Sequence, residues 1–156
     1  MELHHDKHHA TYVNSYNTAI TQLEEAQSAG DIAAQIVLKP LINFHGGGHL
    51  NHSLFWENLA PKSQGGGEPP KGELSKAIDQ RYGGLDGFKD KFNAALAGIQ
   101  GSGWAWLVKD NVTGDISIKT YAVSFTGSML WLDSADVSFL IESRSCCWPI
   151  HSSLGH

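Results

Sequence analysis

Residues 45–56 read HGGGHLNHSLFW, and the rest of the chain is organised around this stretch. The positions that share one stripe of a helix, at about 3.6 residues per turn, are His45, His49, His52 and Trp56. Each of the three glycines costs such a helix about 0.8–1 kcal/mol relative to alanine. Glycines are kept inside a helix where another backbone or a bound group comes very close. Three imidazoles and an indole beside a strip without Cβ atoms therefore favour a metal site over histidines that merely face water.

The composition indicates a folded globular protein. The chain has 156 residues, enough for one ordinary domain or two small ones with a real core. Its 41% hydrophobic and 17% charged residues are not those of a disordered chain. The formal net charge of -5 argues against nucleic acid or an anionic membrane as the main partner. No apolar run approaches the ~20 residues that a membrane-spanning helix needs.

The cysteines and the beginning of the chain carry little further information. Cys146 and Cys147 are the only two cysteines, and because they are adjacent we expect no disulfide framework between distant parts. The first residues do not have the pattern of a targeting peptide, since Glu2 and Asp6 come early and no arginine precedes Arg81. They open directly into a helical pattern without an N-cap, which indicates a chain that begins within a helix.

Residues 1–60 are predicted to form an N-terminal helical hairpin. The stripe of the first helix consists of His4, His8, Tyr12, Tyr16, Ala19 and Leu23. Gly30 is expected to stop this helix, and Asp31 to cap the next one. Pro40 removes one helical hydrogen bond, so we expect a kink or a restart there. The hairpin brings the two histidine-bearing faces together.

Residues 61–72 are predicted to be a linker, because they are rich in glycine and proline and lack an apolar period. Residues 73–122 should form a partial C-terminal α/β domain, with helices over 74–82 and 86–99, the second capped by Asp86. Strands are predicted over 104–108 and 116–121, joined by a turn over 111–115. Residues 123–156 are predicted to be a divergent tail, with Met129–Leu132 as its candidate strand. The predicted fold class is α+β.

Four stretches of the sequence carry a resemblance to a known family. They are MELHHDKHHATYVN (1–14), FHGGGHLNHSLFWENLAP (44–61), GGGEPPKGEL (65–74) and GSGWAWLV (101–108). In this order and spacing, residues 1–122 resemble the iron/manganese superoxide dismutases, and specifically the manganese type of fungal mitochondria. This resemblance implies a helical hairpin followed by a mixed domain with a three-stranded antiparallel sheet, and a metal between the two.

The resemblance also implies an activity and a set of site residues. The activity is the disproportionation of superoxide, with protons, to oxygen and hydrogen peroxide at a single manganese ion, iron being the alternative. By motif, the implied metal ligands are His4 and His52, the catalytic residues on the substrate and proton path are His8 and Tyr12, and the pocket is lined by Phe44, Trp56 and Trp104. A homo-oligomer, dimer or tetramer, is implied, located in the mitochondrial matrix, with the cytoplasm as the alternative because the chain shows no targeting pattern.

The sequence departs from the family pattern after Ala122. The family's other two ligands lie on a D-x-W-E-H segment, and no Asp of this sequence is followed four residues later by His. Residues 123–126 read VSFT where the family has Asn-Gln-Asp-Pro, and the segment that completes the dimer contact is missing. With two ligands of four, the half-site is expected to favour copper, nickel or zinc over manganese. Asp133 is the candidate for a replacement carboxylate.

Three hypotheses are left open by the sequence. The first is a manganese superoxide dismutase that is impaired by its missing ligands. The second is a non-catalytic truncated isoform that keeps the hairpin and pairs with full-length subunits. The third is a histidine-rich fragment that binds metal weakly and has no catalytic role.

Overall fold

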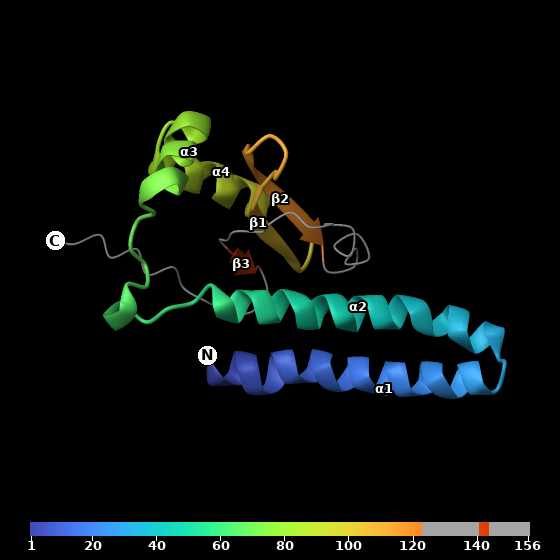
Figure 1. The fold of residues 1–156 in the computed structure, drawn as a ribbon. Helices are drawn as coiled ribbons and strands as arrows, with labels where there is room; N and C mark the ends of the chain where they lie inside the picture. Colours follow the sequence, from blue (N-terminus) through green and yellow to red (C-terminus); the bar gives the residue numbers. More distant parts are fainter. Residues whose placement is uncertain (123–140, 144–156) are drawn as a thin grey trace.

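The structure is a computed structural model, and it describes residues 1–122 and 141–143. Figure 1 shows a long helical hairpin lying beside a smaller unit of two helices and a sheet. This arrangement confirms the predicted α+β class. The predictions for Met129–Leu132 and Asp133 lie outside the described residues. Within the part of the chain that the structure describes, no helix is long and apolar enough to cross a membrane.

The hairpin consists of a π-helix, Leu3–His9, that continues into α1, Ala10–Ser28, and is followed by α2, Ile32–Glu57. Between the two long helices, Gly30 has a φ of 70°, a left-handed conformation that suits glycine. The backbone N–H of Ala34 then donates a 2.9 Å hydrogen bond to Oδ1 of Asp31. Both predictions for this turn, the stop at Gly30 and the cap at Asp31, are confirmed.

A kink or a restart is predicted at Pro40. The restart is wrong, because α2 runs without a break from Ile32 to Glu57 with Pro40 inside it, and the kink stays a prediction. Proline lacks the N–H that would donate to the carbonyl of Ile36. Both Pro40 and Ile36 are exposed, Ile36 to 67%, so water can hydrogen-bond to that carbonyl. An exposed position thus lets the helix tolerate the proline.

The glycines of α2 make room for aromatic rings of α1. A Cβ on Gly48 would collide with the ring of Tyr12, and one on Gly46 would lie 3.0 Å from Cε2 of Tyr16. The close approach that is expected at these glycines is therefore made at Gly46 and Gly48 by side chains, and not by a backbone. The rings of Tyr12 and Tyr16 occupy the space beside these glycines, and the missing glycine side chains allow α1 and α2 to pack closely along the histidine-bearing stripe.

The second unit begins after a short 3-10 helix, Lys62–Gln64, with α3, Gly72–Tyr82, and α4, Leu85–Ala97. Gly83 ends α3 in a left-handed conformation. The prediction that Asp86 caps α4 is wrong, since the N-cap is Gly84, with φ 121° and ψ 175°. The helix begins at Leu85, directly after this glycine. Asp86 therefore lies in the first turn, where its negative charge interacts favourably with the helix dipole.

The sheet has three antiparallel strands in the order β2-β1-β3, as the family resemblance implies. They are β1, Gly103–Lys109, β2, Ile116–Ala122, and β3, Ile141–Ser143. Trp104 of β1 pairs with Tyr121 on one side and with Ser143 on the other. The third strand lies in the segment for which the sequence shows no strand pattern. Its sequence contains a charged residue among only three, too few for a period of two to be visible.

The central strand β1 is buried on both faces. Ala105 and Leu107 pack into a core with the inward side chains of α3 and α4, which include Phe88 and Phe92. The alternate residues form a second cluster on the opposite face, which consists of Trp104, Trp106 and Val108 with Leu54, Phe55 and Tyr121 packed against it. Because side chains alternate along a strand, β1 joins the C-terminal core to α2 of the hairpin.

Candidate metal centre

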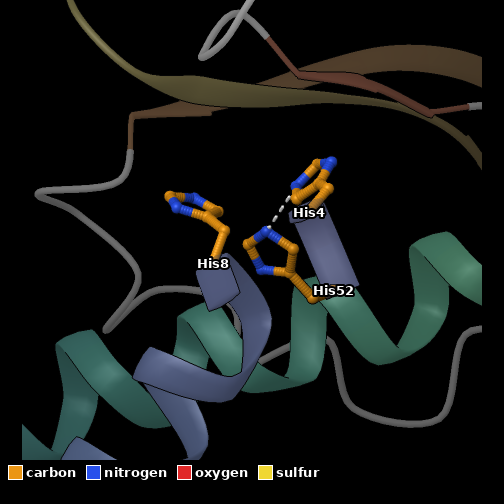
Figure 2. Close-up of side chains that lie close together, drawn as sticks. All are labelled: His4, His8 and His52. Carbon is orange, nitrogen blue, oxygen red and sulfur yellow. Dashed lines mark hydrogen bonds between the residues drawn. The ribbon is translucent and has the colours of Figure 1, made fainter. Parts of the chain in front are cut away.

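Three histidines gather where the hairpin meets the sheet. One potential ligand atom from each of His4, His8 and His52 lies within 4.8 Å of the others. Figure 2 shows His4 and His8 coming from the N-terminal helix and His52 from α2, with their rings close together. In the part of the chain that the structure describes, no carboxylate belongs to this group.

The orientation of His52 is fixed by the helix that carries it. Its Nδ1 donates a 2.7 Å hydrogen bond to the carbonyl oxygen of Gly48, one turn earlier on α2. Since a carbonyl can only accept, Nδ1 carries the proton, and Nε2 of the neutral ring is left with a free lone pair. A histidine that binds a metal through one ring nitrogen usually donates the N–H of the other ring nitrogen to a carbonyl, a carboxylate or a water molecule.

The lone pair of His52 points at His4. The two Nε2 atoms are 3.1 Å apart, and the ring centroids 5.0 Å. His8 completes the group, its ring centroid lying 5.3 Å from that of His4 and 5.1 Å from that of His52. Two helices that are far apart in sequence thus direct three imidazoles into one small volume.

Burial favours the neutral form of His52 and of His4. His52 is only 2% exposed, and the loss of solvent, reinforced by the neighbouring histidines, lowers its pKa to about 4. Desolvation also lowers the pKa of His4, and the nearby His8 adds to this effect. A neutral ring has a lone pair to give to a metal, whereas a protonated ring has none.

The remaining residues named from the family resemblance lie around this cluster. The ring of Tyr12 is 5.4 Å from His8 and 5.2 Å from His52 by centroids, and burial raises the pKa of its phenol. Trp104 of β1 stands edge-on to His52 at 5.0 Å. Phe44 packs against Tyr12, with the ring centroids 5.9 Å apart.

Trp56 and two further histidines form a separate network. The indole N–H of Trp56 donates a 2.9 Å hydrogen bond to Nδ1 of His9. Nε2 of His9 must then carry the proton of the neutral ring, and it lies 2.8 Å from Nδ1 of His49. The ring centroids of Trp56 and His4 are 5.3 Å apart, so this network packs against the cluster through His4.

His9 is the residue that the sequence analysis missed. It is 8% exposed and stacks on His52 at 5.3 Å. In an α-helix His9 would point away from His4 and His8, but the wider i→i+5 turn of the π-helix brings it toward their side. The signal in the sequence is the pair His-His, which occurs at 4–5 and again at 8–9. The first member of each pair lies in the cluster, and the second member of the later pair, His9, packs beside it.

The four-residue stripe of α2 faces the first helix along its whole length, as predicted, but only one member belongs to the metal cluster. Besides the contacts of His49, His52 and Trp56, the ring of His45 lies 6.1 Å from that of Tyr12. His45 and His49 therefore serve packing between the helices, and His52 alone is directed at His4 and His8.

The histidine cluster lies on the helical hairpin, and Trp104 of the antiparallel sheet packs against it. Residues 1–60 match the model of the iron/manganese superoxide dismutase alpha-hairpin domain, and residues 70–134 match that of the C-terminal domain of the same enzymes. The chain belongs to the iron/manganese superoxide dismutase family. The second match extends beyond Ala122 and includes Asp133.

Individual relatives agree with this assignment. The chain is 53% identical over 122 residues to mitochondrial manganese superoxide dismutase 3.1 of Zea mays, covering 78% of this chain and 52% of that protein. It is 47% identical over 142 residues to mitochondrial manganese superoxide dismutase 1 of Arabidopsis thaliana, covering 88% and 62%. The mitochondrial manganese enzyme of Aspergillus fumigatus is 52% identical over 121 residues, covering 77% and 58%. The chain thus spans about half to three-fifths of these relatives.

Manganese is the ion that these relatives imply, and the described donor set does not fit it by itself. Manganese is suited by carboxylate, carbonyl and water oxygens, and the cluster in residues 1–122 and 141–143 offers three imidazoles without a carboxylate. His4 and His52 can supply the nitrogen part of a manganese site. An oxygen ligand has to come from elsewhere.

Proposed function

We propose that this chain acts on superoxide, as its relatives are named for doing, and that the 156-residue chain by itself is an impaired dismutase. The reaction converts two superoxide anions and two protons to one O₂ and one H₂O₂. The bound metal would supply the chemistry by taking one electron and returning it, which a d¹⁰ ion such as zinc cannot do. One observation carries the proposal: His4 and His52 face each other at 3.1 Å in a water-poor site beside Tyr12.

The residues around the cluster support a proton path. Burial raises the pKa of the Tyr12 phenol, so it stays protonated at neutral pH and can donate. His8 is half-buried and contacts both Tyr12 and His52, a position from which an imidazole can pass a proton inward. Trp56 packs against His4 and Trp104 against His52, which places apolar surface beside the cluster. Phe44 packs against Tyr12.

The proposed impairment follows from the donor set. Loss of a residue that only orients a metal ligand typically costs about 10–100-fold in affinity or activity. A site without its anionic ligand should lose more, since the charge of the oxidised metal is then poorly balanced. The chain is therefore proposed to bind manganese weakly and to turn over superoxide slowly.

A superoxide decay assay on the manganese-loaded chain tests this proposal. The expected result is a rate little above that of free manganese at the same concentration. The His52→Ala variant is the control, because it removes the hairpin ligand and leaves free metal unaffected. A rate near the diffusional ceiling of about 10⁸–10⁹ M⁻¹s⁻¹, abolished in His52→Ala, would contradict the impairment.

A second candidate function is that of a non-catalytic subunit which pairs with full-length relatives. This function is favoured by exposed apolar side chains in the N-terminal half of α2. They are Ile32, Ile36, Val37 and Leu41, which are 63%, 67%, 75% and 43% exposed. Homo-oligomers are implied by the family resemblance, and such a face can bury itself against another hairpin. Mixing the chain with a full-length relative and separating by size tests this: co-elution is expected, and independent elution would contradict it.

The compartment is proposed from the same relatives. The proteins from Zea mays, Arabidopsis thaliana and Aspergillus fumigatus are all named as mitochondrial. We therefore propose the mitochondrial matrix for this chain. Localisation of a tagged chain to the cytoplasm would contradict the proposal.

A further inference from the structure

We propose that His8 joins His4 and His52 as the third ligand of a tri-histidine site for zinc or copper, without a carboxylate. The proposed dismutation gives His8 a place beside the metal, on the proton path, and not a bond to it. The inference therefore concerns a different coordination of the same cluster, and it goes beyond the activity proposed above.

The geometry of the cluster suits one small ion. Two nitrogens bound about 2.0–2.1 Å from one metal lie roughly 2.8–3.4 Å apart when the angle between the bonds is near 90–110°. The observed 3.1 Å between the Nε2 atoms of His4 and His52 lies within this range. His8 has a ligand atom within 4.8 Å of the other two, and it is only half-buried, so a modest rotation of its side chain closes the site.

His52 is already prepared as a ligand. Its Nδ1–H is held by the carbonyl of Gly48, which directs the Nε2 lone pair at His4. Without a metal, the 3.1 Å contact requires that Nε2 of His4 carries the proton. When a metal binds, His4 takes its other neutral tautomer, with the proton on Nδ1, so that the Nε2 atoms of both rings can donate a lone pair to the ion.

The chemistry of the three rings selects the metal. Three imidazoles with one open position form a known zinc arrangement, and imidazole also suits copper. Divalent affinity rises from manganese to copper and remains high at zinc, and a neutral donor set does nothing to reverse this order. Two carboxylates stand two residues from His4 in the sequence, Glu2 and Asp6. Both are exposed, and Asp6 is bonded to His5 instead.

This coordination has a consequence for the proposed activity. A His8 ring whose lone pair is bound to a metal cannot pass protons from Tyr12. A chain loaded with zinc would therefore lack both a redox-active metal and a proton path. The inference does not depend on turnover, because metal binding can be measured whether or not the chain disproportionates superoxide.

Zinc binding to the full chain is measured by calorimetry for the wild type and for His8→Ala and His8→Phe. His8→Phe keeps a ring in contact with His4, Tyr12 and His52, so it guards against loss of folding, which circular dichroism monitors. His5→Ala is the matched control, since it removes an exposed imidazole from the same helix. We expect both His8 variants to bind zinc at least about 10-fold more weakly and His5→Ala to bind as the wild type does. Unchanged zinc affinity in His8→Phe would overturn the inference.

Copper provides a second readout that needs no variant. The hyperfine pattern of bound Cu²⁺ in electron paramagnetic resonance counts the coordinated imidazole nitrogens. Three equivalent imidazoles are expected in the wild type and two in His8→Phe. Two imidazoles in the wild type would overturn the inference, and so would tighter binding of manganese than of zinc in the calorimeter. If the manganese-loaded chain turns over superoxide rapidly while bound Cu²⁺ shows three imidazoles, the proposed impairment is contradicted and the tri-histidine site is not.

Discussion

The carbonyl oxygen of Gly48 accepts a 2.7 Å hydrogen bond from Nδ1 of His52, one turn later on α2. The same residue faces Tyr12, whose ring occupies the space where any other residue at position 48 would have its Cβ. Gly48 thus serves two neighbours: its carbonyl orients a metal-directed imidazole, and its missing side chain seats the phenol beside it.

Replacing Gly48 should therefore disturb both. In Gly48→Ala the new methyl group collides with the Tyr12 ring, and we expect a loss of stability of about 1–3 kcal/mol, reduced by the better helix propensity of alanine. Urea unfolding measures it. Gly98→Ala is the control, because a Cβ there meets only ordinary contacts, of 3.5 Å and 3.6 Å. Equal stability of the two variants would contradict the close approach of Tyr12.

Pro40→Ala is expected to stabilise the chain. The substitution restores the N–H that donates to the carbonyl of Ile36, in an exposed part of α2 where no packing is lost. Proline inside a helix costs about 3 kcal/mol, and part of the gain is offset because proline also restricts the unfolded chain. We predict a net gain of about 1–2 kcal/mol in thermal or urea unfolding. A loss of stability would mean that Pro40 makes a contact that the structure does not contain.

His9→Phe should destabilise the hairpin although it keeps an aromatic ring. The indole N–H of Trp56 loses its acceptor, and His49 loses its 2.8 Å hydrogen bond and keeps only the longer one, of 3.4 Å, to Oγ of Ser53. Leaving the partly buried indole N–H unpaired should cost about 1–2 kcal/mol. The comparison is with His5→Phe, at an exposed position, for which little change is expected. Similar unfolding curves for the two variants would show that the His9 network contributes nothing.

The stability of the metal-free chain should fall between about pH 6.5 and pH 4. Burial lowers the pKa of His52 from 6.5 to about 4, so in this window the unfolded chain binds a proton that the folded chain excludes. Stability is full above about pH 6.5, and roughly 3 kcal/mol is lost by pH 4. His4, His8 and His9 face the ring and disfavour its protonation. Unfolding with chelator present, in wild type and His52→Gln, measures the effect, and a slope that persists in the variant would assign it elsewhere.

Much of the fold could be predicted because its signals are local. The stripes of the two hairpin helices, the stop at Gly30 and the alternation of β1 are all periodic features of short segments. The strand β3 could not be predicted, since it is defined by pairing with β1 across a long separation in sequence. The helix does not restart at Pro40, because the cost of a proline within a helix depends on its exposure, which only the packed structure shows.

The site was predicted in part for a similar reason. His4 and His52 are implied as ligands by the family resemblance, and the structure brings their ring nitrogens to 3.1 Å. His9 was missed because its side chain reaches the cluster only through the wider turn of the π-helix. The π-helical turn is a feature of the backbone hydrogen bonding, and a side-chain pattern with the α-helical period does not predict it.

The most direct test of the account is the metal that the chain retains when several compete. The full chain is dialysed against equal concentrations of manganese and zinc, and the metal per chain is measured by elemental analysis. We predict close to one zinc and a small fraction of one manganese, with zinc lost in His52→Ala. One tightly held manganese per chain would contradict the account, because it would mean that a carboxylate, with Asp133 as the candidate, has completed the site.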